Sequence, residues 1–384
     1  MEAYKRQLAY AAVAGAAVWY GVNKYVEGCE VELVASQTKE SAWQLVTDKC
    51  PSLGRRLVPT PYLCQGMLQT IYGTSVAFKR DEYSSIEYER ESKIMEDGGT
   101  VSLDWYPAKP EGGETIVVVV PGLGGSSSEY HIRSLAKRLA VGSTRVVVSN
   151  HRGSGRTPLT SGRLYNAYDT SDLQAVVDDL NGRYAESVMV CVGFSLGGNL
   201  VTRYLGEQGD DTPIRGAVVI SCPFDTLLAG RALSAPGLLN DRVFQPNLMA
   251  TMRRLVKRNL EVIKNSPLNY DVDAIMKAER MTEIDNLVTA RTYGHEDCWD
   301  YYKAASSVEY VAKIRRPFLA INAEDDPVTP IEGVPRSKFE ENPLTALAVL
   351  RHGGHIGFFT GIRPTIWYLD PVGEFLGAVI QAED

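Results

Sequence analysis

From about residue 83 onward, short apolar runs alternate along the chain with amphipathic stretches. Residues 84–91 and 101–106 predict two strands joined by a hairpin turn at residues 97–99, where the sequence is Asp-Gly-Gly. Six further strands are predicted from runs rich in Val and Ile, at residues 115–120, 144–149, 187–192, 217–221, 317–321 and 345–350. Because these runs lack a period of two, we expect strands buried on both faces, as in a parallel sheet covered by helices.

Helical patterns separate several of these runs, at residues 130–139, 171–180 and 199–205. Alternation of strand and helix predicts an α/β fold with a mostly parallel central sheet and right-handed crossovers. The alternation stops at about 225–314, where the pattern is helical at residues 248–263 and 281–286 and contains no clear strand. We expect this stretch to be a helical cap inserted over the carboxyl edge of the sheet. The alternative is a helical layer packed on one face.

The N-terminal part of the chain is organised differently. Residues 8–22 form a stretch of 15 residues without a charge, preceded by Lys5 and Arg6 and followed by Lys24. This is shorter than the roughly 20 apolar residues that usually span a bilayer. We expect a short membrane anchor within residues 1–26; a cleaved targeting peptide and a packed surface helix are the alternatives. Residues 27–82 are interpreted as an extension that precedes the main domain at 83–384.

Composition and charge narrow the class of protein. The chain has 384 residues, of which 44% are hydrophobic and 23% charged, with a net charge of −7. These values are typical of a globular protein. Short basic stretches without interleaved aromatic residues disfavour a nucleic-acid partner.

The six cysteines form no CxxC pair or other metal-ligand spacing, so they predict no metal site. The chemistry predicted from the motifs below requires neither a metal nor an organic cofactor. Cys191 and Cys222 lie in apolar runs and are interpreted as small buried residues. The pattern suits a reducing compartment, and a luminal disulfide among the three N-terminal cysteines is the alternative.

The sequence Gly193-Phe194-Ser195-Leu196-Gly197 links the apolar run 187–192 to the helical stretch 199–205. This is a G-x-S-x-G motif in the strand–turn–helix context that gives it meaning. Small residues two positions before and after the serine let strand and helix approach closely, and the turn lifts the hydroxyl above the sheet. We predict that Ser195 is a nucleophile; a structural serine is the alternative.

A serine hydroxyl needs a neighbouring base, and in this kind of fold the base follows the last strand. Only His352 and His355 lie there, and His355 is preferred because Gly353 and Gly354 permit a tight loop before it. The acid that orients the base is expected after the preceding strand. Three acids are found at that place, with Asp326 preferred over the alternatives Asp325 and Glu324.

The negative charge that develops on a carbonyl oxygen is usually stabilised by two backbone N–H groups. We expect them at Leu196, directly after the nucleophile, and at Leu123, in the glycine-rich loop 121–125. The same loop lacks the Gly-Lys-Ser/Thr of a phosphate-binding loop and the dinucleotide fingerprint. Residues 151–155 (His-Arg-Gly-Ser-Gly) are interpreted as a structural turn, and the spacing of His295 and Asp300 as a chance match to an acyltransferase pattern.

Beyond these motifs, stretches spread over about residues 55–380 resemble the AB hydrolase 4 family of the α/β-hydrolase superfamily. That family includes YheT-like hydrolases, membrane-anchored α/β-hydrolase domain proteins and fungal medium-chain fatty acid ethyl ester synthase/esterases. The stretches that carry the resemblance include residues 59–63, 68–71, 97–99, 103–105, 121–123, 150–153, 193–198, 301–307, 325–327 and 353–358.

The resemblance implies an α/β-hydrolase fold and a triad of Ser195, Asp326 and His355. It implies carboxylic ester or acylglycerol substrates, with acyl transfer to alcohols as a related activity. Many eukaryotic members carry an N-terminal anchor, which favours the anchor interpretation of residues 8–22. A membrane location, at the endoplasmic reticulum or a lipid droplet, is then expected, with a cytoplasmic location as the alternative.

Together these observations predict a serine esterase that cleaves medium-chain acyl esters or monoacylglycerols through an acyl-enzyme on Ser195. The first alternative is an alcohol O-acyltransferase that makes fatty acid esters. The second is a non-catalytic interaction protein built on the same fold.

Overall fold

The computed structural model describes residues 29–38, 41–76, 86–107, 115–237 and 240–382. The expected anchor within residues 1–26, with its apolar stretch 8–22, lies outside the described residues. None of the helices in the described ranges is both long and apolar enough to span a bilayer.

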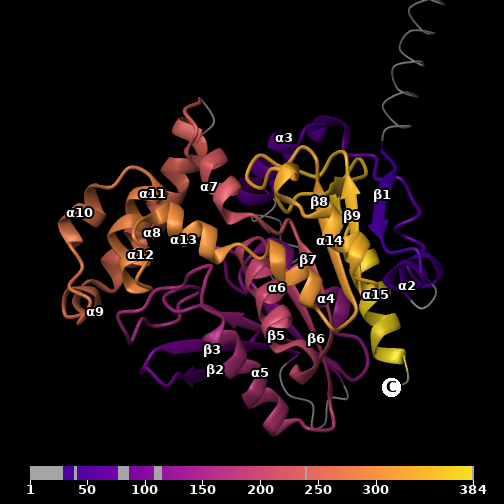
Figure 1. The fold of residues 1–384 in the computed structure, drawn as a ribbon, viewed down its shortest axis with the longest axis horizontal. Coiled ribbons are helices and arrows are strands. Elements are labelled where there is room, and N and C mark those ends of the chain that lie inside the picture. The colour runs from indigo at the N-terminus through magenta and orange to yellow at the C-terminus, as the bar shows by residue number, and fades with distance from the viewer. Residues whose placement is uncertain (1–28, 39–40, 77–85, 108–114, 238–239, 383–384) are drawn as a thin grey trace, which may run out of the picture.

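A nine-stranded sheet forms the centre of the molecule (Figure 1), in the order β1-β9-β8-β7-β6-β4-β5-β3-β2. Neighbouring strands are parallel from β5 to β9, whereas β3 is antiparallel to β2 and β5, and β1 is antiparallel to β9. The strands are β1 (Val31–Ala35), β2 (Glu89–Ile94), β3 (Thr100–Tyr106), β4 (Thr115–Val120), β5 (Thr144–Asn150), β6 (Val188–Phe194), β7 (Ile214–Ile220), β8 (Phe318–Ala323) and β9 (Thr345–Leu350). The predicted α/β fold with a mostly parallel sheet is confirmed.

Helices cover both faces of this sheet, which explains why its central strands are apolar throughout. Along β4, Val117 and Val119 point into the core on one face, while Ile116, Val118 and Val120 point into the core on the other. The first core is completed by α2 (Ala42–Lys49), α4 (Tyr130–Leu139) and α15 (Leu369–Gln381). The second core is completed by α5 (Ser171–Arg183), α6 (Leu196–Gln208) and α14 (Arg336–Glu341).

One strand differs from its expected bounds, and one strand was not predicted. The first strand of the hairpin was expected at 84–91, but β2 occupies Glu89–Ile94, paired in register with β3. Its sequence, ERESKI, is that of a polar edge strand, so no run of apolar residues marks where the strand begins and ends. The strand β1 was not expected, because its assignment depends on pairing with β9, far away in the sequence.

A run of helices lies between β7 and β8, to one side of the sheet in Figure 1. The helix expected at 248–263 is divided at Asn259 into two helices. Residues of this run share an apolar core of their own with Leu159 and Leu164, which follow β5. The helices are α7 (Thr226–Ser234), α8 (Gln245–Arg258), α9 (Leu260–Lys264), α10 (Val272–Lys277), α11 (Met281–Ile284), α12 (Ala290–Thr292) and α13 (Cys298–Ala305).

The N-terminal extension contributes helix α3 (Gly66–Ile71), which packs against the loop that follows β9. The same region is tied to the short hairpin of β10 (Phe359–Thr360) and β11 (Thr365–Ile366), since the Thr60 N–H donates to the Phe359 carbonyl at 3.0 Å. The extension is therefore packed on the carboxyl end of the parallel strands rather than standing apart from the sheet.

Candidate active site

The order of the strands creates a crevice at the carboxyl edge of the sheet. Strand β4 lies between β5 and β6, so the connections that leave β4 and β6 run to opposite sides. In open α/β sheets, such a switch point is where ligands bind. Ser195 directly follows β6, and the glycine-rich loop 121–125 directly follows β4.

Ser195 occupies a strained backbone position between β6 and α6. Its φ of 49° and ψ of −122° are rarely adopted by residues with a side chain. The neighbouring glycines are required by close packing. A Cβ at Gly193 would lie 2.7 Å from the Gly198 Cα, and one at Gly197 would lie 2.3 Å from the Val120 carbonyl oxygen. The turn can therefore form only where the residues two positions before and two positions after the serine are glycines.

The structure brings Ser195, His355 and Asp326 into one chain of hydrogen bonds. The Nε2 atom of His355 lies 2.8 Å from the Ser195 Oγ, and its Nδ1 atom lies 2.9 Å from the Asp326 Oδ2. The Asp326 side chain is fully buried, whereas Ser195 remains partly exposed. With the Nδ1 proton donated to Asp326, the Nε2 atom is free to accept the proton of the serine hydroxyl.

The two neighbouring aspartates have different partners. Besides His355, Asp326 accepts hydrogen bonds from the Val328 and Thr329 N–H groups and from the Thr329 hydroxyl. The geometry therefore links the preferred acid, rather than Asp325, to the preferred base.

Asp325 instead holds the loop that carries His355. It lies 3.1 Å from the His352 Nδ1 and accepts the N–H groups of Gly353 and Gly354 at 2.9 Å each. Burial raises the pKa of Asp325, but these hydrogen bonds outweigh burial and hold the pKa below its usual value. The third candidate, Glu324, has an exposed side chain.

Two backbone N–H groups beside the serine are available to donate hydrogen bonds to a ligand. Among the described residues, neither the Leu123 N–H nor the Leu196 N–H has a hydrogen-bond acceptor. Leu196 is the first residue of α6, and the first N–H groups of a helix have no partner within it. A Cβ at Gly122 would lie 3.1 Å from the Ser195 Cβ, so the loop that contains Leu123 runs directly beside Ser195.

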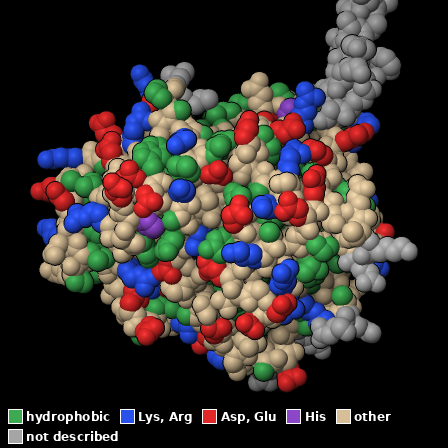
Figure 2. Space-filling view, in the orientation of Figure 1, with side chains coloured by type: hydrophobic (Ala, Val, Ile, Leu, Met, Phe, Trp, Pro, Cys, Tyr) green, Lys and Arg blue, Asp and Glu red, His purple; other side chains and the backbone are tan. Residues whose placement is uncertain are grey.

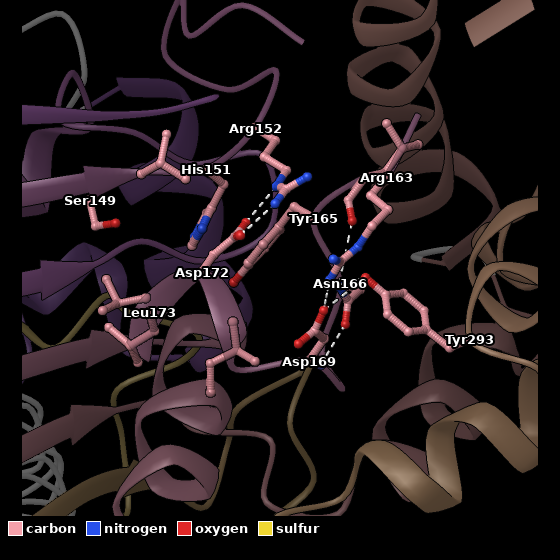
Figure 3. Close-up of a pocket in the computed structure, with 14 residues that line it drawn as sticks. Ser149, His151, Arg152, Arg163, Tyr165, Asn166, Asp169, Asp172, Leu173 and Tyr293 are labelled. Atoms are coloured by element: carbon pink, nitrogen blue, oxygen red, sulfur yellow. Dashed lines mark hydrogen bonds and ion pairs between the residues drawn. The ribbon is translucent and has the colours of Figure 1, made fainter. Parts of the chain in front are cut away.

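Behind this loop lies a buried polar cluster, which Figure 3 shows in close-up. The His151 Nε2–H donates to the Pro121 carbonyl at 2.8 Å, and the imidazole stacks on the ring of Tyr165. Burial lowers the pKa of His151 to about 4, so the ring is neutral at pH 7. The cavity beside these rings has a volume of about 20 Å³, enough for about one water molecule, so it is no substrate pocket.

The same cluster joins three segments of the chain through Arg152. Its guanidinium lies 2.6 Å from Asp172 at the start of α5 (Figure 3). It also lies 2.5 Å from Asp97 in the β2–β3 turn. Burial works against ionisation of Asp97, but the hydrogen bonds from Arg152 lower the pKa of Asp97 to about 2. Residues 151–155 were predicted to be a structural turn, and the contact between His151 and Pro121 was not predicted. The one available signal was the position of this turn after a predicted parallel strand.

The remaining candidate, His295 with Asp300, lies in the helical run. The two side chains are 3.2 Å apart, and His295 is surrounded by Tyr168 and Tyr301. No hydrogen bond among the described residues links it to Ser195 or His355. Nor do the described ranges contain a group of three or more His, Cys, Asp or Glu side chains that could hold a metal ion.

The sheet order and the serine on a strained turn after its central strand define an α/β hydrolase fold. A family model described as alpha/beta hydrolase fold matches residues 115–362. The chain belongs to this family.

Curated relatives are consistent with the resemblance to its AB hydrolase 4 members. The chain is 30% identical to the phospholipase ABHD3 of Mus musculus, over 89% of this chain and 83% of that protein. It is 28% identical to a monoacylglycerol lipase of Saccharomyces cerevisiae, over 87% of this chain and 83% of the relative.

A third relative is the medium-chain fatty acid ethyl ester synthase/esterase 2 of the same yeast. It is 28% identical, over 84% of this chain and 85% of the relative. Among solved structures, an esterase of Pyrococcus furiosus superposes with a TM-score of 0.50 at 19% identity, covering 77% of this chain and 93% of the esterase. That likeness supports the fold.

Proposed function

We propose that this protein is a serine esterase that hydrolyses carboxylic esters of lipid-like substrates, with medium-chain acyl esters or monoacylglycerols as the substrate class. The observation that carries the proposal is the unbroken chain of hydrogen bonds from the Ser195 hydroxyl through His355 to Asp326. The names of the relatives, which include a lipase, a phospholipase and an ester synthase/esterase, support the choice of lipid esters.

In the first half of the reaction, the Ser195 Oγ forms a bond to the ester carbonyl carbon while its proton moves to the His355 Nε2. Asp326 stabilises the resulting imidazolium. The carbonyl electron pair moves onto oxygen, and the N–H groups of Leu123 and Leu196 stabilise that negative charge. When the carbonyl re-forms, the bond to the alcohol breaks, and the alcohol leaves with the proton held by His355.

The second half releases the acyl group from Ser195. His355 accepts a proton from water, and the water oxygen attacks the acyl carbon. Collapse of the second tetrahedral intermediate breaks the bond to the Ser195 Oγ, which regains its proton from His355. The products are the carboxylic acid and the free enzyme, and neither a metal nor an organic cofactor takes part.

We assign the helices between β7 and β8, at about 225–314, the function of a cap that shapes the acyl site. Helix α8 supports this assignment, because a Cβ at Gly124 would lie 2.8 Å from the Thr251 Cγ2. The loop that carries Leu123 is thus in contact with the helical run. On the face drawn in Figure 2, acidic and basic side chains are interspersed, which fits an uncharged ester better than a polyanion.

The test is hydrolysis of p-nitrophenyl esters over a series of acyl lengths. We expect wild-type turnover with an optimum at medium chains, and a loss on the order of 10⁴-fold or more in Ser195→Ala, because the nucleophile is absent. Thermal unfolding of both proteins is the control for folding. Turnover in Ser195→Ala above a few per cent of wild type would contradict the assignment of the nucleophile.

The second candidate function is acyl transfer to an alcohol, favoured by the similarity to the yeast ethyl ester synthase/esterase. The acyl-enzyme is common to both reactions, so the acceptor alone decides the product. Adding ethanol to the same assay measures the ratio of ethyl ester to free acid. The third candidate, a non-catalytic interaction protein, would leave Ser195 unlabelled by a fluorophosphonate probe.

We also propose that residues 8–22 attach the protein to a lipid surface. The support lies in the sequence, where 15 uncharged residues are flanked by Lys5, Arg6 and Lys24. Basic residues beside an apolar stretch favour binding at a lipid headgroup region. Flotation of the purified protein with phospholipid vesicles tests this attachment. The full chain should float with the vesicles, and a chain lacking residues 1–26 should not.

A further inference from the structure

The loop that carries His355 contains three residues with positive φ, two of which have side chains. Gly354, Ile356 and Phe358 have φ values of 57°, 61° and 48°. A residue with a side chain is strained in this region, most of all a β-branched one such as Ile356. Two of these three residues directly flank His355. The loop therefore keeps its shape only where other parts of the protein hold it.

Side chains from three other segments hold the backbone N–H groups of this loop one after another. Asp325, after β8, accepts the N–H groups of Gly353 and Gly354. Ser221, after β7, accepts the N–H of Ile356 at 3.0 Å. The remaining two acceptors, which hold the N–H groups of His355 and Phe359, both come from α3 in the N-terminal extension.

Thr70 on α3 holds the histidine itself. Its hydroxyl accepts the N–H of His355 at 2.9 Å and donates its own proton to the Gly66 carbonyl at 2.8 Å. The side chain is 4% exposed, so water does not replace it readily. The hydroxyl thus has one fixed orientation, with an acceptor lone pair aimed at the backbone of His355.

The backbones of α3 and the histidine loop are in direct contact at this point. A Cβ at Gly354 would lie 2.1 Å from the Gly66 carbonyl oxygen, and one at Gly66 would lie 2.0 Å from the Asp325 carbonyl oxygen. Farther along, the Gln69 Oε1 accepts the Phe359 N–H at 2.7 Å, and the Gln69 side chain is fully buried. Helix α3 therefore contacts the histidine loop both at Gly354, before His355, and at Phe359, after it.

We propose that Thr70 is a positioning residue for the catalytic histidine, and that α3 makes the N-terminal extension part of the catalytic unit. This inference rests on the proposed function, in which His355 is the base for Ser195. Residues 66–71 lie before residue 115, where the match to the hydrolase family model begins. The extension thus supplies an element that the matched part of the chain lacks.

The physical effect is on the orientation of the imidazole. The peptide N–H that Thr70 accepts belongs to His355, so losing the hydroxyl frees the backbone directly beneath the ring. A displacement of about 1 Å at a reacting group can cost about 10²-fold in rate. The hydrogen bonds of the Thr70 hydroxyl go to the histidine loop and to its own helix. Removing the hydroxyl should therefore leave the affinity for the ester substrate unchanged and slow the chemical step.

The experiment compares four variants of the full chain: Thr70→Val, Thr70→Ser, Thr70→Cys and Thr74→Val. Valine has the shape of threonine without an acceptor, serine restores the acceptor, and cysteine is a weak one. Thr74 is the matched control, because its hydroxyl donates to the Thr70 carbonyl at 3.0 Å, and within the described ranges no hydrogen bond joins it to the histidine loop. The measurements are kcat and KM for a p-nitrophenyl ester, the rate of fluorophosphonate labelling, and Tm.

We expect kcat and the labelling rate of Thr70→Val to fall on the order of 10–100-fold, with KM within about threefold of wild type. Thr70→Ser should recover to within about threefold, Thr70→Cys should lie between, and Thr74→Val should match wild type. Labelling counts only folded protein with a competent Ser–His pair, and the cysteine variant covers the case in which valine prevents folding.

Wild-type kcat in Thr70→Val, or a serine variant as slow as the valine variant at the same Tm, would overturn the inference. Ser195→Ala, assayed alongside, separates the two proposals. If Ser195→Ala still turns over, the proposed function fails. If it is inactive while every Thr70 variant is fully active, the function stands and only the positioning role of Thr70 is wrong.

Discussion

At the scale of single residues, the site contains two aspartate–histidine pairs that look alike in sequence. Asp326 with His355 and Asp325 with His352 have Nδ1–carboxylate distances of 2.9 and 3.1 Å. Only His355 has its second ring nitrogen beside Ser195. The Oδ1 atom of Asp325 accepts hydrogen bonds from the N–H groups of both Gly353 and Gly354. Asp325 therefore stabilises the loop and does not contact the imidazole of His355.

The two aspartates should therefore respond differently to the same substitution. Asp326→Asn should lower kcat on the order of 10⁴-fold, because an amide cannot stabilise the imidazolium and favours the wrong tautomer. Asp325→Asn keeps an oxygen for the two glycine N–H groups and should retain activity within about tenfold. Steady-state kinetics of both variants, with unfolding curves as the control, make the comparison. Equal losses in the two variants would contradict the division of roles.

At the scale of elements, the site depends on how closely β4, β6 and α6 approach one another. Ser195 is held in its strained conformation by hydrogen bonds from its N–H to the Ile220 carbonyl and from the Gly198 N–H to its own carbonyl. The Gly197 backbone lies against the end of β4, where the Val120 and Pro121 carbonyl oxygens leave no room for a Cβ. The approach of α6 to β4 thus sets the distance between the nucleophile and the loop that contains Leu123.

Gly197→Ala should consequently be severely destabilising. The new methyl group would meet two backbone oxygens that cannot move without shifting β4, so we expect a loss of about 3 kcal/mol or more in the free energy of unfolding. The matched control is Gly182→Ala in helix α5, where a Cβ would have no described atom within 4 Å apart from its chain neighbours and the backbone of its own helix. There, alanine should stabilise by about 0.5–1 kcal/mol. Denaturant unfolding of the two variants measures both effects, and a Gly197→Ala protein as stable as Gly182→Ala would refute this account of the elbow.

At the scale of the whole molecule, a buried polar cluster connects distant segments behind the site. Arg152 joins the β2–β3 turn to α5 through Asp97 and Asp172, and His151 next to it joins β5 to the loop after β4. His151 is neutral in the folded protein because burial lowers its pKa to about 4, although the Pro121 carbonyl and Asp172 favour the protonated ring. The stability of the fold is therefore linked to pH through a group that takes no part in the reaction.

This linkage predicts a loss of stability as the pH falls from about 6.5 towards 4. In that window the unfolded chain binds a proton on His151 and the folded chain does not, so the free energy of unfolding decreases by up to about 1.4 kcal/mol per pH unit. His151→Gln keeps an N–H near the Pro121 carbonyl and does not titrate. Its unfolding free energy should fall less steeply with decreasing pH than that of wild type. Parallel curves for the two proteins would show that His151 is not the group responsible.

Local pattern alone determined much of this protein. The strands buried on both faces, the alternation with helices and the G-x-S-x-G turn follow from short stretches whose apolar order or glycine content permits few conformations. Ser195 could be predicted for that reason, as could a histidine after the last strand. The order of strands then brings these loops to one edge of the sheet, whatever the details of packing.

Contacts between segments far apart in sequence were decided only by the tertiary structure. The choice between Asp325 and Asp326 depends on which carboxylate faces which ring. The bond from His355 to Thr70 spans 285 residues, and no local pattern encodes a contact of that separation. Strand β1 and the contact of His151 with Pro121 were missed for the same reason. A hydrogen-bond partner is defined by position in space, and position in space follows from the packing of the whole chain.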